Sequence, residues 1–263
     1  GAPEHPYPNF ADGSNRGSVS IASLLCREIG CSPTVGSLTG QTVGDLFEKY
    51  TRTFIDAAFS QLSHLRPGGW LYTTQMPISA FAQYQHLAHV SDLINQSAEL
   101  RAAFGSDYLI KPDVIVARKR VTDGEINQNA AVLEDNQLAQ HTPFRAGNES
   151  VLGDYILHAS ISCKWTIRSD RSQNARTEAL NLIRNRKGHT PHIVAVTAEP
   201  LPMRIASLAL GTGDLDCVYH IALPELQRAV EQTGNEDQLS MLNDLITGQR
   251  LRDISDLPFD LAA

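Results

Sequence analysis

The sequence has no long apolar run, no closely spaced cysteine pair and no internal repeat. Its longest apolar runs, such as residues 193–196, are far shorter than the roughly 20 residues that a membrane-spanning helix needs. The opening segment Gly1–Phe10 is polar and proline-rich, so we expect no secretory signal there. The four cysteines form neither a C-x-x-C pair nor a zinc-like spacing, and we expect reduced thiols. These absences favour a protein of the cytoplasm that has no membrane partner.

An excess of basic charge is also missing, because 22 Lys and Arg residues are outnumbered by 29 Asp and Glu residues, which gives a formal net charge of −7. Taken alone, this balance argues mildly against nucleic-acid binding. The charge is unevenly distributed, however, because residues 164–187 contain seven basic residues and only two acids, Asp170 and Glu178. The sequence therefore allows a basic face on an acidic body, although a solvated helix face explains the same pattern equally well.

The chain does have enough apolar material for a core, since 42% of its 263 residues are hydrophobic. We expect residues 1–263 to form a single domain, with residues 1–9 at its periphery. Hydrophobic residues recur at helical spacing in 42–65, 81–104, 169–186, 224–232 and 237–247. Apolar runs predict strands at 112–117, 157–167, 192–197 and 216–222, and residues 123–148 read as loop-rich. Strands framed by helices predict an α/β (α+β) fold with a mixed central sheet flanked by helices.

Three charged side chains fall at or beside the predicted strands. Asp113 is at the beginning of the strand over 112–117. In the next strand, alternation places Ser162 and Lys164 on one face and their apolar neighbours on the other. A lysine in such surroundings is costly to bury without a partner, and a carboxylate on a neighbouring strand would supply one. Glu178 lies on the following helix, which could fold back and bring its carboxylate to the same edge.

Two carboxylates and one lysine at a sheet edge have a clear chemical use. Carboxylate oxygens bind a hard divalent cation, which polarises a phosphoryl group and lowers the pKa of a bound water. An ammonium group orients the attacking water or stabilises the developing charge. This is the logic of the Asp…Glu/Asp-x-Lys nucleases. Each piece is weak alone, because Pro-Asp commonly starts a strand or turn, Ser-x-Lys is a frequent exposed strand face, and Glu178 would more often be solvated.

The segment Arg168-Ser169-Asp170-Arg171 adds a second function to this site. Arginine pairs bidentately with guanine in the major groove, and a carboxylate accepts a hydrogen bond from the amino group of cytosine. A helix N-terminus would present Arg168, Asp170 and Arg171 together, so the set matches G·C base pairs. The plainer interpretation is that Ser169 or Asp170 caps the helix.

The sequence around these residues resembles the NgoMIV-like Type II restriction endonucleases, which belong to the PD-(D/E)xK nuclease superfamily. More distantly, it is similar to the wider group of tetrameric enzymes that read a CCGG core. The likeness is closest in ISCKWTIRSDR (161–171), NRKG (185–188), VTAEP (196–200), ALGTG (209–213) and DISDLP (253–258). It extends from about Asn9 to Ala263 and implies a restriction-endonuclease-like core.

The resemblance also implies roles for individual residues. Asp113, Lys164 and Glu178 match the metal-binding and catalytic residues, Glu48 matches a further acid of the site, and Ser162 matches a residue near them. The backbone carbonyl of Cys163 would be a metal ligand. The major-groove residues that read the inner four base pairs are matched by Arg168, Asp170 and Arg171. The remaining matches are Gln41 for a minor-groove contact and Asp12, Ser14 and Arg204 for the outer base pair.

The family pattern further implies Mg²⁺ as the cofactor, with two ions in each active site and Mn²⁺ able to replace it. It implies double-stranded DNA as the substrate, the site GCCGGC cut after the first G, a homotetramer built as a dimer of dimers, and a cognate DNA methyltransferase as a functional partner in a prokaryotic cytoplasm. This sequence departs from the family in residues 1–9, which do not resemble its N-terminal segment, and in residues 123–154, which form a longer stretch.

Three other functions fit parts of the sequence. A repair or junction nuclease of the same fold would need no G·C-reading set such as Arg168, Asp170 and Arg171. A hydrolase with a Ser162–Lys164 dyad would need a neutral lysine in a dry pocket and would leave Asp113 and Glu178 without roles. A non-catalytic DNA-binding module would not need an intact set of catalytic residues.

Overall fold

The computed structural model describes residues 7–31, 38–104, 110–133, 138–148, 153–167, 169–211 and 213–263, and it leaves the side chains of residues 104 and 169–173 undescribed. The helices of the described chain are α1 (Arg16–Ile29), α2 (Gly40–Gln61), α3 (His86–Gln96), α4 (Ala98–Phe104), α5 (Asp123–Ile126), α6 (Ser169–Asn185), α7 (Pro202–Ala209), α8 (Leu223–Thr233), α9 (Glu236–Thr247) and α10 (Leu257–Ala262), with 3₁₀ turns η1 (Ile78–Ala80) and η2 (Ile254–Asp256).

A six-stranded mixed sheet organises these helices. Its strands lie in chain order: β1 (Trp70–Thr73), β2 (Val114–Lys119), β3 (Tyr155–Lys164), β4 (His192–Thr197), β5 (Cys217–His220) and β6 (Leu251–Asp253). The pairs β1–β2 and β2–β3 are antiparallel, whereas β3, β4, β5 and β6 run parallel. The prediction of a mixed sheet flanked by helices is therefore confirmed.

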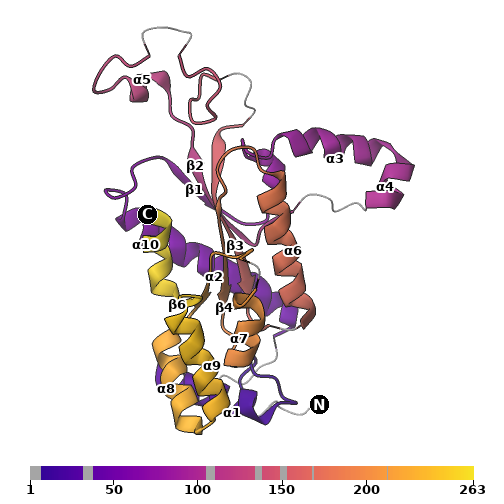
Figure 1. The fold of residues 1–263 in the computed structure, drawn as a ribbon, viewed down its shortest axis with the longest axis vertical. Coiled ribbons are helices and arrows are strands. Elements are labelled where there is room, and N and C mark those ends of the chain that lie inside the picture. Colours follow the sequence, from indigo (N-terminus) through magenta and orange to yellow (C-terminus); the bar gives the residue numbers. More distant parts are fainter. Residues whose placement is uncertain are drawn as a thin grey trace.

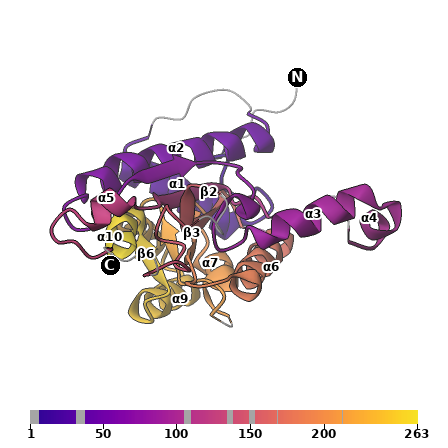
Figure 2. The same cartoon turned by 90° about the horizontal axis from the view of Figure 1, so that it is seen from above.

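Two hydrophobic layers enclose the sheet (Figures 1 and 2). On one face, Phe47, Ile55 and Phe59 of α2 and two leucines of α10 pack against Val114, Val196 and their neighbours. The opposite face packs against α6, α7, α8 and α9, and α1 lies against α8. The helices α3 and α4 extend away from this layered body (Figure 1). A strand end that lies between α2 and α6 is thus approached by side chains from both layers.

Capping residues explain where several helices begin and end. Asn15 caps α1 by accepting the Ser18 N–H at 3.0 Å, and Gly30 ends it in the left-handed conformation with φ 77°. Thr39 caps α2, and Asn235 caps α9. Pro202, at the start of α7, lacks the N–H that a first helical turn leaves unpaired anyway.

Several predicted boundaries are wrong. The helix expected over 42–65 ends at Gln61, before the Pro-Gly-Gly sequence. The helical region expected over 81–104 begins only at His86 and consists of two helices, because Ser97 is extended (φ −113°, ψ 122°) and its hydroxyl accepts the Leu100 N–H at 3.2 Å. The strand expected to reach Ile167 ends at Lys164, since the Ile167 N–H donates to Glu199 at 2.8 Å instead of continuing the sheet.

Other elements were not predicted at all, namely α1, α7, α10 and the edge strands β1 and β6. The loop-rich segment 123–148 contains the short helix α5. All four cysteines have free thiols. In the described part of the chain, no helix combines the length and apolarity that crossing a membrane would require.

Candidate functional site

The antiparallel pairing of β2 and β3 brings Asp113 and Lys164 together. Val114 at the start of β2 pairs with Ile161, so the residue before it lies beside the end of β3. The Lys164 Nζ is 3.1 Å from the Asp113 Oδ2, and the same oxygen accepts the Cys163 N–H at 2.7 Å. The two side chains are 16% and 20% exposed. The lysine thus has the carboxylate partner that its strand position demanded.

Two further acids approach this pair from the two helical layers. Glu178 on α6 is half-buried, and desolvation raises its pKa, with Asp113 adding to the increase and Lys164 opposing it. Glu48 on α2 is also half-buried, and burial followed by the Asp113 charge raises its pKa. Three carboxylates therefore share the electrostatic field of one ammonium group. Such a cluster is short of positive charge, which is the condition that a bound cation relieves.

Gln75 holds one of these acids in place. Its Nε2 donates to the Glu48 Oε2 at 3.1 Å, and its backbone N–H donates to the carbonyl of Pro112 at 3.3 Å, directly before Asp113. Its φ of 57° lies in the left-handed region that non-glycine residues rarely adopt. A strained residue that contacts one acid and the residue before another is typical of a functional site. The sequence offered no signal for Gln75, because the contact joins distant segments.

Ser162 and Cys163 present different atoms to the site. The Ser162 Oγ is buried and finds no hydrogen-bond partner among the described residues, so this polar atom is available to a group from outside. The Cys163 thiol packs on the opposite face, where burial raises its pKa, so only the backbone of this residue faces Asp113. A hydroxyl without a partner and a backbone group beside three acids fit an oxygen-ligated ion better than thiolate chemistry.

The donor set fits a hard cation. Mg²⁺ is usually held by one or two carboxylates together with waters and substrate phosphate oxygens, not by a complete protein cage. In the described residues, no three His, Cys, Asp or Glu side chains converge closely enough to form a ready-made metal site. The carboxylates of Glu178 and Glu48 are instead each close enough to the Asp113–Lys164 pair to be influenced by its charges, so these acids could share a cation with waters and phosphate oxygens.

The predicted base-reading segment is only partly described. Arg168 lies outside the described residues, and Asp170 and Arg171 lie in the first turn of α6 with their side chains undescribed. The side chains of Ser169 and Asp170 lie outside the description, so the plainer interpretation that one of them caps α6 stays a prediction. The first turn of α6 follows the end of β3 closely, as the sequence suggested.

The three residues matched to the outer base pair contact one another. The Arg204 guanidinium pairs with the carboxylate of Asp12, and the Ser14 hydroxyl donates to the same carboxylate at 2.7 Å. The hydrogen bonds from Ser14 and Arg204 lower the pKa of Asp12 to about 2. Gln41, the predicted minor-groove residue, is exposed at the start of α2 and donates to Asp45 at 2.8 Å.

A buried network at the end of β4 escaped the sequence interpretation. Glu199 is 0% exposed and accepts the Ile167 N–H at 2.8 Å and the Leu201 N–H at 3.2 Å. Thr197, also 0% exposed, donates its hydroxyl to the Lys164 carbonyl at 2.7 Å and accepts the Glu199 N–H at 3.1 Å. An acid two residues after a largely apolar strand was the available signal, because burying it requires partners.

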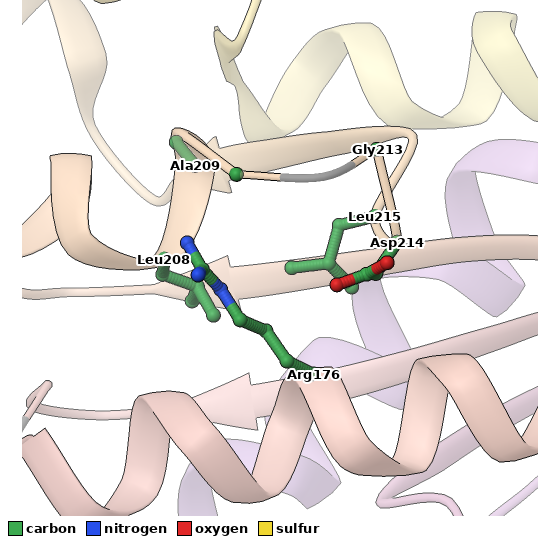
Figure 3. A pocket seen from close by; sticks show the side chains of 7 residues that line it. Arg176, Leu208, Ala209, Gly213, Asp214 and Leu215 are labelled. Carbon is green, nitrogen blue, oxygen red and sulfur yellow. The ribbon is translucent and has the colours of Figure 1, made fainter.

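A small pocket lies apart from these groups, between α6 and the loop after α7 (Figure 3). Arg176 reaches from α6 toward this loop, where its guanidinium donates to the carbonyls of Ser207, at 2.7 Å, and Leu210. A Cβ atom at Gly211 would come within 2.7 Å of the guanidinium, so the glycine leaves room for this contact. The pocket is lined by none of the predicted catalytic residues, and Arg176 fastens α6 to the loop.

Known proteins match nearly the whole chain. A family model described as the NgoMIV restriction enzyme matches residues 2–263, so the likeness begins earlier than the expected Asn9. The Type II restriction enzyme NgoMIV from Neisseria gonorrhoeae is 48% identical over 257 residues, which cover 96% of this chain and 88% of that protein.

Proposed function

The chain belongs to the NgoMIV restriction enzyme family, and from this membership we propose that it cuts double-stranded DNA at GCCGGC, after the first G, leaving 5′-CCGG overhangs. As a family member it is a Type II restriction endonuclease, a site-specific enzyme that binds double-stranded DNA. The observation that supports the catalytic part is the contact between Lys164 and Asp113, with Glu48 and Glu178 close enough to perturb it electrostatically.

Mg²⁺ is the proposed cofactor, two ions in each site, and Mn²⁺ would replace it. The carboxylates of Asp113, Glu178 and Glu48, together with the carbonyl of Cys163, would hold the metal. When bound, Mg²⁺ neutralises phosphoryl charge and supplies a metal-activated water at neutral pH. The excess of carboxylates over ammonium groups at this edge favours cation binding.

The remaining chemistry belongs to the side chains of the chain. Lys164 places its ammonium group at the site, where it stabilises charge on the scissile phosphate and orients the attacking water. The Cys163 N–H fixes the orientation of the Asp113 carboxylate, and Gln75 does the same for Glu48. Positions held in this way before substrate arrives need little rearrangement in the transition state.

Sequence reading is proposed to use two groups of residues. Arg168, Asp170 and Arg171, at the start of α6, would contact the inner CCGG in the major groove. Asp12, Ser14 and Arg204 would read the outer base pair, and their hydrogen-bonded cluster presents them as one unit. Gln41, at the exposed start of α2, would reach the minor groove.

Assembly follows from the symmetry of the site. A palindrome with identical half-sites requires a two-fold dimer of this chain, and we propose that two such dimers form a tetramer. Sedimentation would then give a mass near four chains, and a plasmid with two sites would be cut faster than one with a single site.

We also propose that the whole chain is one domain that works in a prokaryotic cytoplasm beside a cognate DNA methyltransferase.

Two alternatives make different demands on the same residues. A nuclease of the same fold with another recognition site would keep the metal dependence and change the mapped ends. A Ser162–Lys164 dyad would require these two side chains to share a hydrogen bond. Within the described part of the chain, the Ser162 Oγ bonds to no group and the Lys164 ammonium donates to Asp113, so the geometry disfavours the dyad.

Plasmid digestion with and without Mg²⁺, followed by mapping of the ends, tests the proposal. We expect metal-dependent cuts only at GCCGGC, with 5′-phosphates and four-base 5′ overhangs. Cleavage in EDTA would refute the metal mechanism. Ends that map to another sequence would refute the proposed site and leave the nuclease family intact.

A further inference from the structure

The end of β4 connects three segments that the proposed function uses separately. One is the end of β3 at Lys164, one is the approach to the base-reading residues at Ile167, and one is the start of α7, which contains Arg204. Thr197 contacts the first segment, and Glu199 contacts the other two. We propose that Glu199, together with Thr197, is a positioning residue that couples base reading to DNA cutting. This inference rests on the proposed function.

The Glu199 carboxylate joins the two base-reading groups. Its Oε2 accepts the N–H of Ile167, the residue directly before Arg168, at 2.8 Å. Its Oε1 accepts the N–H of Leu201, the N-cap residue of α7, at 3.2 Å. Arg204 lies one turn into that helix and pairs with Asp12. One rigid side chain therefore sets the distance between the segment that reads the inner base pairs and the helix that reads the outer pair.

Thr197 extends this connection to the catalytic strand. Its hydroxyl donates to the Lys164 carbonyl at 2.7 Å, and its oxygen accepts the Glu199 N–H at 3.1 Å. Both residues are 0% exposed, so solvent does not compete for these hydrogen bonds. A shift of either base-reading segment would therefore displace the backbone of the catalytic lysine.

A buried carboxylate is unfavourable in free energy for a purely structural contact. Burying an acid costs free energy unless it is paired, and in the described residues no Lys, Arg or His forms an ion pair with Glu199. Its chemical advantage is that it offers two acceptor oxygens and no donor, which suits two converging N–H groups. Arg204 and Asp12 are close enough to influence its ionisation in opposite directions, so the carboxylate adjoins the outer base-pair cluster.

The substitution Glu199→Gln tests this role with little change in shape. A glutamine can accept only one of the two N–H groups and turns a donor toward the other. We expect the ratio of kcat/KM for GCCGGC over ACCGGT to fall about 10- to 100-fold, because small misplacements of reading groups have effects of this size. The ratio is independent of how much protein is folded, so a merely structural role would not change it.

A second pair of variants follows the connection to the catalytic strand. Thr197→Val removes the hydroxyl and keeps the shape, and we expect kcat on GCCGGC to fall about tenfold. Thr197→Ser retains the hydroxyl and should restore most of that rate. Tyr219→Phe is the control for lost stability, since Tyr219 on β5 would lose its hydroxyl hydrogen bond to Asp260 on α10, and the ratio should remain unchanged.

The outcomes separate this inference from the proposed function. An unchanged ratio in Glu199→Gln, whatever its Tm, overturns the coupling role. If Glu199→Gln does not fold, wild-type kcat in Thr197→Val overturns it instead. If the wild-type protein cuts another sequence, only the proposed site is refuted, and the same ratio is measured on that sequence instead. Wild-type protein that cuts no DNA would refute the proposed function and the inference with it.

Discussion

The two ends of the β2–β3 pair bury polar groups in different ways. At the end with Asp113 and Lys164, one ammonium group lies near several carboxylates, and no described residue forms a hydrogen bond with the Ser162 hydroxyl. At the opposite end, directly after β2, Arg120 is 6% exposed and its guanidinium donates to the carbonyls of four residues of the following loop, Pro143, Arg145, Asn148 and Gly153. Both ends belong to the same two strands.

The polar groups of the Arg120 end satisfy one another. Arg145 forms a bidentate pair with Asp123, at 2.6 and 2.7 Å, and also donates to the Leu138 carbonyl at 2.7 Å. That end is organised for stability, because its buried cations have their partners within the chain. The Asp113 end is organised for a ligand, because its acids and its hydroxyl need groups from outside. Incomplete internal pairing thus distinguishes the end that we propose to be catalytic from the structural one.

Removing Lys164 should have the largest effect on activity. We expect Lys164→Ala to lower the single-turnover cleavage rate by about 10³-fold, since it deletes the ammonium group that stabilises the phosphoryl charge. Lys119→Ala is the matched control, because this exposed lysine ends β2 at the opposite end and should have no effect. A Lys164→Ala protein with wild-type rates would remove the distinction between the two ends.

Removing Arg120 should instead affect stability. We expect Arg120→Ala to lower the free energy of unfolding in urea by about 3 kcal/mol, because several charge-assisted hydrogen bonds disappear and buried carbonyls lose their donor. The neighbouring Lys119→Ala should change it by less than about 0.5 kcal/mol, as is usual for exposed positions. A loss below about 1 kcal/mol for Arg120→Ala would mean that water replaces the guanidinium without cost.

The same contrast explains how much of the fold the sequence could predict. Strand β4 was predicted with its observed bounds, because the apolar run 193–196 is flanked by the polar residues His192 and Thr197. The edge strands β1 and β6 were missed, since four and three residues are too few to show a period. The break at Ser97 was missed because the apolar pattern continues through it, and only the side-chain bond to Leu100 ends the helix.

The site shows a similar division. The contact between Asp113 and Lys164 could be inferred, because alternation and strand pairing place both at one sheet edge. The pairing of Arg204 with Asp12 joins residues from opposite ends of the chain, so spacing gave no hint of it and only the family resemblance did. Gln75 and Glu199 were missed because their partners depend on how loops pack.

His158, between the two ends of β3, should make the protein sensitive to acid. Burial lowers its pKa to about 4 from the usual 6.5, while its Nε2 is 2.8 Å from the Leu261 carbonyl. A depressed histidine pKa means that the unfolded chain binds the proton more tightly, so stability is complete above pH 6.5 and falls as the pH decreases toward 4. We expect a loss of about 2 kcal/mol from this group between pH 7 and pH 5.

Urea unfolding at the two pH values measures this loss. His158→Gln should flatten the pH dependence by that amount, while His192 and His220, whose pKa values are also lowered by burial, keep their own contributions. If the free energy of unfolding changed equally with pH in wild type and His158→Gln, protonation of His158 would cost no stability. The middle of β3 would then resemble neither the Asp113 end nor the Arg120 end.

Arg204 should affect specificity and leave the chemistry intact. We expect Arg204→Ala to cost about 1–3 kcal/mol of discrimination between GCCGGC and ACCGGT, because the side chain that we propose to read the outer base pair is lost. Competition cleavage of two labelled duplexes measures the ratio. Arg228→Ala is the control, because Arg228 lies on the surface of α8 and forms a comparable ion pair with Glu28 of α1. Undiminished preference in Arg204→Ala would assign the Asp12–Arg204 pair to structure, like the Arg145–Asp123 pair.

Gln75 should have the smallest effect on stability, and its sign is opposite to that of Arg120. The left-handed backbone of Gln75, with φ 57°, strains any residue with a Cβ, so Gln75→Gly should stabilise the protein by about 0.5–1 kcal/mol. The same change removes the hydrogen-bond donor to Glu48, and we expect the cleavage rate to fall about tenfold. Residues that hydrogen-bond to metal ligands have effects of this size.

Gln249→Gly separates these two consequences. Gln249 has nearly the same φ, 55°, but lies between α9 and β6, where its N–H donates to Ile246. Relief of strain should stabilise both variants to a similar degree, whereas only Gln75→Gly should lose activity. Equal activity in the two variants would show that the strain at Gln75 is incidental. Loss of activity in Gln75→Gly alone, together with a higher Tm, would show that the catalytic end of β2 gives up stability to hold Glu48 in place.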